Sequence, residues 1–273
     1  MSNDESKRIQ ILAAEGATNE LVDVAIIAVG FGIEAKRKFG IETTAYWEDD
    51  GLDQALGARP DRPHRILVSG AGDGALIDLM RATLRDFRHE EILDLLPKGE
   101  ALQLLQERLL TIETTAKRAR IISRSSFMSL HQMYDQLELN DAFIDQIRQR
   151  IRHDTEVWFN FTSPGRYIIT SSILNRFLVA VLCRLNAIKP KLGRMEEKLV
   201  TVDATGRYAV RWSNNDEPQV FDRIIVHHGP PEDYLGSIFP NLADASTPLG
   251  GKLRELNLTD TLDRATSDFF SKA

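Results

Sequence analysis

A chain of 273 residues with 40 acidic and 34 basic side chains has a formal net charge of −6, which gives no general field for attracting nucleic-acid phosphates. The single cysteine excludes an internal disulfide, and the sequence has no run of about 18 apolar residues that would cross a membrane. The first residues, MSNDESKRIQ, are polar and lack the apolar segment of a secretory signal. We therefore expect a cytoplasmic protein that binds neither nucleic acid nor membrane.

The first region, residues 1–62, contains one strand-length apolar run, VAIIAV, which is typical of a strand buried on both faces of a parallel sheet. Gly30 and Gly32 end this run. A later segment, FDRIIVHHG, repeats the order of aspartate, apolar run and glycine. Two strands that enter one ligand cleft in the same way would share this pattern, and so would two unrelated buried strands. Gly30 and Gly32 are therefore candidate cofactor contacts.

The second region, residues 63–150, begins with the order strand, glycine turn, helix. ILVS is the predicted strand, Gly70 to Gly74 form the turn, and apolar residues then recur at helical spacing as far as Phe87. Beyond Pro97, about 50 residues are helical by pattern. We predict a Rossmann-like nucleotide-binding unit with a helical extension, which would serve as a lid, as an interface with a partner subunit or second copy, or as packing.

The third region, residues 151–273, alternates strands and a helix. EVWFNF is strand-like, RYIIT is expected to begin the next element, SSILNRFLVAVLCRLNAI is a strong helix, and two β segments then precede the buried strand RIIV. Asn175 and Arg176, near the start of that helix, either present a polar pair to a ligand or, as the simpler interpretation, face solvent. Cys183 is expected to be buried and not nucleophilic. Together the regions predict an α/β fold: a Rossmann-like parallel sheet with a helical segment and a β-meander.

The glycine turn matches the pattern G-x-G-x-x-G/A at Gly70, Gly72 and Ala75, directly between a strand and a helix. The first glycine allows a tight turn, the second lets a phosphate approach the backbone, and the small third residue lets helix and strand pack closely. Free amides at the helix start, around Asp73 and Gly74, favour an anion there. The pattern predicts a nucleotide site, the alternative being a strand-to-helix turn without a ligand.

Dinucleotide sites of this kind also place an acidic residue about 20 positions further on, at the end of a second strand, where it binds ribose hydroxyls. Glu91 has the required spacing, within a segment that reads as either a short strand or the end of the helix. NAD and NADP cannot be distinguished without knowing which side chain meets the ribose.

Asp73 introduces a second interpretation, because G-A-G-D-G also resembles the first motif of S-adenosylmethionine-dependent methyltransferases and of aminopropyl transferases. Most methyltransferases have an acidic residue two positions before the first glycine, where this chain has Val68. Aminopropyl transferases have an apolar residue there, but they also need a later acidic catalytic segment, and we find no convincing one downstream.

The segment VDVAIIAVGFGIE, with Asp23 and Ala28, resembles the D-x-h-h-x-A-x-G segment by which two-dinucleotide flavoproteins return to their FAD domain. The order that follows, a second glycine loop, a meander and a closing strand, also resembles that group. The resemblance covers residues 21–231 and implies an FAD/NAD(P)-binding oxidoreductase-like protein that transfers hydride. On this basis residues 1–62 and 151–273 would be parts of a flavoprotein-like domain.

One feature of that group is missing: the chain does not open with the glycine fingerprint that binds FAD. The resemblance therefore implies a truncated or degenerate form, which argues against FAD and leaves NAD(P) at Gly70–Ala75 as the first candidate. A non-catalytic nucleotide-binding interaction module is a third interpretation.

Two histidines, His227 and His228, follow the buried strand RIIV, at the place where α/β folds carry chemistry. Adjacent residues of an extended strand point to opposite faces, so only one of them can serve a given cleft. We choose His228 as the candidate catalytic residue, with a structural histidine as the alternative. No metal site is expected.

Overall fold

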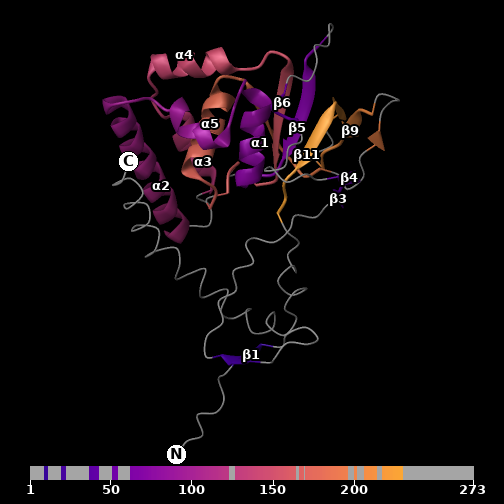
Figure 1. Ribbon diagram of the computed structural model, residues 1–273, viewed down its shortest axis with the longest axis horizontal. Coiled ribbons are helices and arrows are strands. Elements are labelled where there is room, and N and C mark those ends of the chain that lie inside the picture. The colour runs from indigo at the N-terminus through magenta and orange to yellow at the C-terminus, as the bar shows by residue number, and fades with distance from the viewer. Residues whose placement is uncertain are drawn as a thin grey trace, which may run out of the picture. The chain divides into compact units, whose positions relative to one another are not determined.

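The computed structural model describes residues 9–11, 20–22, 37–42, 51–54, 62–122, 127–163, 166–168, 170–195, 200–201, 206–213 and 217–229 (Figure 1). The chain forms two compact units, one of Met1–Gly32 with Glu232–Ala273 and the other of Ile33–Pro231. The described part of the first unit is an antiparallel pair, β1 (Ile9–Ile11) with β2 (Glu20–Val22). The domain boundaries predicted after residues 62 and 150 both fall inside the second unit.

A four-stranded parallel sheet forms the centre of the second unit, in the order β11-β5-β6-β7. Its strands are β5 (His64–Ser69), β6 (Thr155–Phe161), β7 (Ile188–Leu192) and β11 (Arg223–Val226). Ile66, Leu67 and Val68 of β5 are fully buried, as expected for a central strand covered on both faces. The predicted α/β class with a Rossmann-like parallel sheet is therefore confirmed.

The connections between these strands create a point where the strand order reverses. From β5 the chain passes through α1 (Asp73–Thr83) to β6 and through α5 (Ile173–Arg184) to β7, so the sheet grows in one direction. The chain then returns to the other side of β5, where β11 pairs with it in parallel. In open α/β sheets, ligands bind at the carboxyl ends of the strands beside such a reversal, here β5 and β11.

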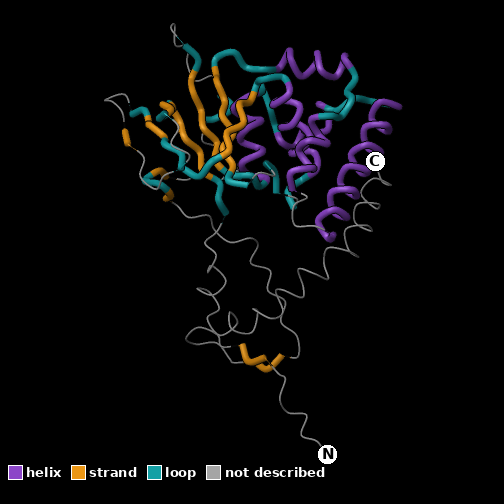
Figure 2. The backbone as a smooth tube through the Cα atoms, turned by 180° about the vertical axis from the view of Figure 1, so that it is seen from behind, coloured by secondary structure: helices purple, strands orange, loops and turns teal. Residues whose placement is uncertain are grey.

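Helices cover one face of the sheet and short strands cover the other (Figure 2). On the helical face, α1 and α5 pack together and on the sheet, α3 packs on α5, and α2 packs on α3. The remaining helices are η1 (His89–Leu95), α2 (Glu100–Ile122), α3 (Phe127–Asp135) and α4 (Asp141–Arg150). Among the described residues, no helix is long and apolar enough to cross a membrane.

The other face carries the predicted β-meander, which is an antiparallel sheet of β8 (Val200–Thr201), β9 (Tyr208–Val210) and β10 (Gln219–Phe221). Val210, Trp212 and Phe221 from this region form a second apolar cluster with Leu67 of β5. A further pair, β3 (Arg37–Lys38) with β4 (Ile41–Glu42), adds Ile41 to the same cluster.

Strand β7 was not predicted, and RYIIT, expected to begin an element, forms no strand among its described residues 166–168 and 170. The sequence of β7 is IKPKL, and Pro190 within it reads as a strand breaker. Proline is tolerated there because, among the described strands, β7 lies at the edge of the sheet and pairs with β6 alone.

Candidate functional site

The glycine turn lies at the carboxyl end of β5, and its first glycine is required by the fold itself. Gly70 has φ +139°, and a Cβ at this position would lie 2.1 Å from the main-chain oxygen of His227. The same Cβ would lie 3.2 Å from the Cβ of Ala75, so a small residue is also needed at position 75. Gly70 and Ala75 thus bring β5, β11 and the start of α1 close together, as the glycine pattern predicts.

Gly72 differs from Gly70, because nothing in the described structure explains why it is glycine. Its φ is −85°, which any residue adopts, and a Cβ added to it would meet no atom of the described residues within 4 Å. Gly72 is the N-cap of α1, and within the described residues no side chain accepts a hydrogen bond from the amides of the first turn, at Asp73, Gly74 and Ala75. Within the described part of the chain, the start of α1 therefore combines space beside Gly72 with main-chain donors that favour an anion.

Asp73 places a negative charge at this helix start. Its Oδ1 accepts hydrogen bonds from the main-chain nitrogen of Ser172 and from Nδ2 of Asn175, both at 2.8 Å. The carboxylate therefore lies between the N-termini of α1 and α5, where both helix dipoles favour it. The same charge would repel a phosphate at this turn.

Asn175 and Arg176 were predicted to face solvent, and this prediction is wrong, since each is 1% exposed. Arg176 forms an ion pair with Glu113 of α2, with Nη2 and Oε2 2.7 Å apart, and the hydroxyl of Tyr134 donates to Glu113 Oε1 at 2.6 Å. The first turn of α5 is buried because α5 lies between the sheet and α3.

A row of polar side chains crosses the sheet at its carboxyl edge on the meander face. His228 Nε2 lies 2.8 Å from Ser69 Oγ, and this hydroxyl donates to Asn160 Oδ1 at 2.9 Å. Nδ2 of Asn160 donates to the main-chain oxygens of Lys191 and Gly193, at 3.1 and 2.8 Å. Ser69 and Asn160 are buried, while His228 is exposed. Sequence reasoning missed Ser69 and Asn160 because they are far apart in the chain.

His227 points to the helical face of the sheet. Its Nε2 lies 2.8 Å from Asp78 Oδ2 of α1, and Arg81 donates to the other carboxylate oxygen of Asp78 at 2.9 Å. The two histidines therefore contact opposite faces, as strand geometry predicts, with His227 buried and His228 accessible.

Glu91 is not brought to the glycine turn. It is exposed on η1, which is a 3-10 helix and not the end of a second strand. After α1 the chain reaches the amino edge of the sheet, opposite the edge that carries the glycine turn. There Leu84 forms a β-bridge with Ile151, which lies shortly before β6. The next element, η1, packs against α4. The spacing that selected Glu91 therefore does not correspond to a strand end. Gly30 and Gly32 lie outside the described residues.

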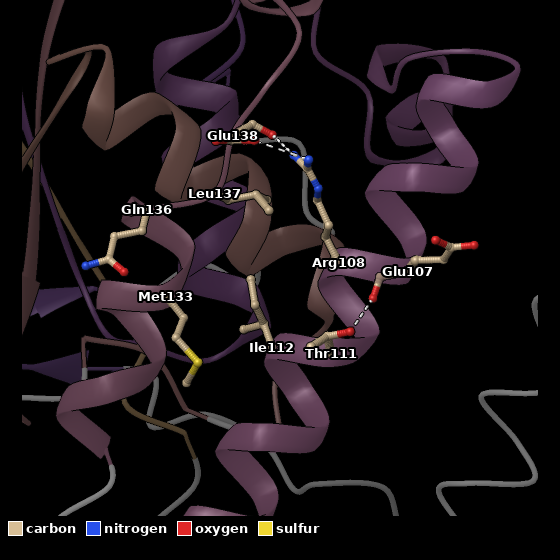
Figure 3. Close-up of a pocket in the computed structure, with 8 residues that line it drawn as sticks. All are labelled: Glu107, Arg108, Thr111, Ile112, Met133, Gln136, Leu137 and Glu138. Carbon is tan, nitrogen blue, oxygen red and sulfur yellow. Dashed lines mark hydrogen bonds and ion pairs between the residues drawn. The ribbon is translucent and has the colours of Figure 1, made fainter.

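A separate pocket of about 530 Å³ lies between α2 and α3 (Figure 3). Ile112, Met133 and Leu137 are its apolar lining residues. At its rim, Arg108 turns towards Glu138 and donates to the main-chain oxygen of that residue at 2.9 Å. None of the residues that line this pocket belongs to a glycine turn or to the N-terminus of a helix, the two features that favour an anion at the start of α1.

Among the described residues, neither a nucleophilic cysteine nor a metal-binding cluster is found. Burial raises the pKa of the Cys183 thiol to about 12, so the thiolate that a nucleophile requires does not form near neutral pH. No group of three histidine, cysteine, aspartate or glutamate residues in the described ranges is arranged to hold a metal ion.

Comparison with known proteins does not identify a family. No protein-family model matches the chain, and no curated protein or solved structure shows significant similarity to it. The function must therefore be inferred from the residues at the carboxyl ends of β5 and β11.

Proposed function

We propose that this chain binds a nucleotide cofactor at the carboxyl ends of β5 and β11, in the manner of FAD/NAD(P)-dependent oxidoreductases. The observation that carries the proposal is the contrast within the glycine turn. Packing accounts for Gly70 and Ala75, whereas Gly72 has no described residue against the position of its absent side chain and has an ordinary φ of −85°. A ligand phosphate lying against the backbone would account for Gly72 as well.

In this proposal the diphosphate of NAD(P) lies over the first turn of α1, where the amides of Asp73, Gly74 and Ala75 have no side-chain acceptor in the described structure. The nicotinamide would supply hydride transfer, and the protein would bind and orient it. His228, exposed at the end of β11, is the residue that we expect to face the ligand.

Asp73 favours a second candidate, a transferase that uses S-adenosylmethionine or a related sulfonium nucleoside. Its carboxylate is held at the turn by Ser172 and Asn175. A fixed negative charge at this position opposes a diphosphate but attracts a cationic ligand.

Thermal unfolding with added NAD, NADP, FAD or S-adenosylmethionine tests these proposals. A ligand at about 100 times its Kd stabilises the native state by about 2.7 kcal/mol, which raises the Tm of a chain this size by roughly 5–11 °C. The variant Gly72→Leu should abolish the shift by filling the open space. Gly72→Ser is the matched control for folding, since serine is a favourable N-cap residue and adds only a small side chain.

The variant Asp73→Asn separates the two candidates, because asparagine keeps an oxygen for Ser172 and Asn175 but removes the charge. It should strengthen binding of NAD(P) and weaken binding of S-adenosylmethionine. An unchanged ligand-induced shift in Gly72→Leu would place the site elsewhere. A stable protein that responds to none of the four ligands would contradict the proposal and favour an interaction module.

A further inference from the structure

We propose that the nucleotide site of this chain selects NADP over NAD, with Arg166 as the residue that binds the 2′-phosphate of the adenosine ribose. This inference rests on the proposed function, since it names which of the two nicotinamide cofactors binds at the glycine turn. The strand that pairs with β5 after α1, and the side chains at its carboxyl end, determine the choice.

Strand β6 takes the place of the second strand of a dinucleotide fold. It is the next strand of the parallel sheet after β5 and pairs with it, and the main-chain nitrogen of Gly70 donates to the main-chain oxygen of Asn160 in β6 at 3.0 Å. The end of this second strand meets the adenosine ribose, where an acidic side chain binds the 2′-hydroxyl of NAD and an arginine accommodates the 2′-phosphate of NADP. The helices η1 to α4 are inserted before β6, so a spacing of about 20 residues does not reach this strand.

The end of β6 carries donors for a phosphate and no carboxylate for a ribose hydroxyl. The sequence has no acidic residue between Glu156 and Glu196, a stretch that includes this strand end. Thr162 and Ser163 follow the strand and are exposed, and the main-chain nitrogen of Arg166 donates to the main-chain oxygen of Ser163 at 3.1 Å. Hydroxyl and guanidinium groups donate hydrogen bonds to phosphate, whereas a carboxylate would repel it.

The described residues of the loop between β6 and α5 are fixed beside the glycine turn at two points. The main-chain nitrogen of Ile168 donates to the oxygen of Ala71 at 3.4 Å, and the main-chain nitrogen of Ser172 donates to Oδ1 of Asp73 at 2.8 Å. A nucleotide whose diphosphate lies over the first turn of α1 therefore has this loop beside its ribose.

The guanidinium of Arg166 is mostly enclosed and incompletely partnered. Its side chain is 16% exposed, and its Nη1 lies 3.5 Å from Oδ1 of Asp135 at the end of α3. Its Nε is buried without a hydrogen-bond acceptor among the described residues. A cation in this position has lost hydration that one long ion pair does not replace, and a phosphate at its exposed part would supply the missing charge. Arg166 also has φ +57°, a left-handed conformation that is costly for a residue other than glycine and that is concentrated at functional sites.

Isothermal titration calorimetry of the full chain with NADP and with NAD measures the preference. We expect NADP to bind at least about tenfold more tightly, the effect of one hydrogen bond to a charged group. Arg166→Met removes the cation and should weaken NADP binding by at least about tenfold without changing the affinity for NAD. Arg148→Met removes an exposed positive charge from α4, and as the matched control it should change neither affinity.

Two further variants change the charge next to the proposed phosphate position. Thr162→Asp adds a carboxylate at the end of β6 and should reverse the preference in favour of NAD. Asp135→Asn keeps an oxygen for Arg166 but removes a negative charge, so it should strengthen NADP binding. Loss of both cofactors in a folded Asp135→Asn variant would make Asp135 the residue that meets the ribose and would overturn the assignment of Arg166.

The wild-type ratio and Thr162→Asp test the proposal even where Arg166→Met does not fold. Equal affinities for NAD and NADP, unchanged by Thr162→Asp, would overturn the selection of NADP and leave the glycine-turn site standing. Binding of S-adenosylmethionine alone, or of no nucleotide at all, would refute the selection of NADP together with the proposed binding of NAD(P).

Discussion

The buried ion pair between Glu113 and Arg176 gives a quantitative test of how the helical layers are held on the sheet. The two side chains are 3% and 1% exposed, and their charged atoms lie 2.7 Å apart. At this separation the attraction is about 6 kcal/mol for an effective dielectric constant of about 20. The cost of removing both charges from water offsets most of it, because that cost is several kcal/mol for each ion.

Removing one partner is expected to cost far more than removing both. Glu113→Leu leaves the Arg176 charge buried without its acid and should lower the free energy of unfolding by about 3–5 kcal/mol. The double variant Glu113→Leu with Arg176→Met replaces the pair with apolar side chains and should be more stable than either single variant. Urea unfolding of the wild type, both single variants and the double variant gives the coupling energy directly.

An exposed pair provides the control for this measurement. Asp145 and Arg148 lie 3.0 Å apart with side chains about 60% exposed, and Asp145→Ala should change the free energy of unfolding by no more than about 0.5 kcal/mol. If Glu113→Leu costs less than about 1 kcal/mol, or if the effects of the two single variants simply add, the pair does not have the structural role described.

Three further predictions concern backbone geometry and ionisation. Gly70→Ala should destabilise the fold by about 3 kcal/mol or more through its φ and its overlap with a main-chain oxygen, whereas Gly72→Ser should stay within about 0.5 kcal/mol in chemical denaturation. Cys183, whose thiol pKa rises from 9.0 to about 12 on burial, should have a thiolate fraction at pH 8 about a thousandfold smaller than in the unfolded chain; rapid reaction of the native protein with a thiol reagent would contradict this. Burial also raises the pKa of Tyr134 and of Tyr167. All three groups then ionise first in the unfolded chain, so stability should fall above about pH 9, by up to about 1.4 kcal/mol per pH unit for each group; a flat profile between about pH 9 and 11 would show that these groups are accessible.

Local sequence patterns predicted the elements that matter most to the fold. The apolar run of β5, the glycine turn and the spacing of apolar residues in α1 all follow from neighbouring residues. The same is true of β6, α5 and β11, whose largely apolar sequences are typical of elements buried in an α/β fold. A strand such as β7, with proline and two lysines, cannot be recognised in this way, because only its place at the sheet edge makes its composition acceptable.

The sequence by itself determined the α/β class and the position of the glycine turn, since both depend on short-range periodicity and on residues that permit a tight turn. Only the tertiary structure decided which polar side chains meet. Strand pairing brings Ser69, Asn160 and His228 together from distant parts of the chain, and helix packing buries Arg176 against Glu113. These contacts depend on the register of the strands and on how the helices are layered on the sheet, and no local sequence pattern encodes either. A polar residue in a local pattern gives no indication of whether it will face water or a buried partner.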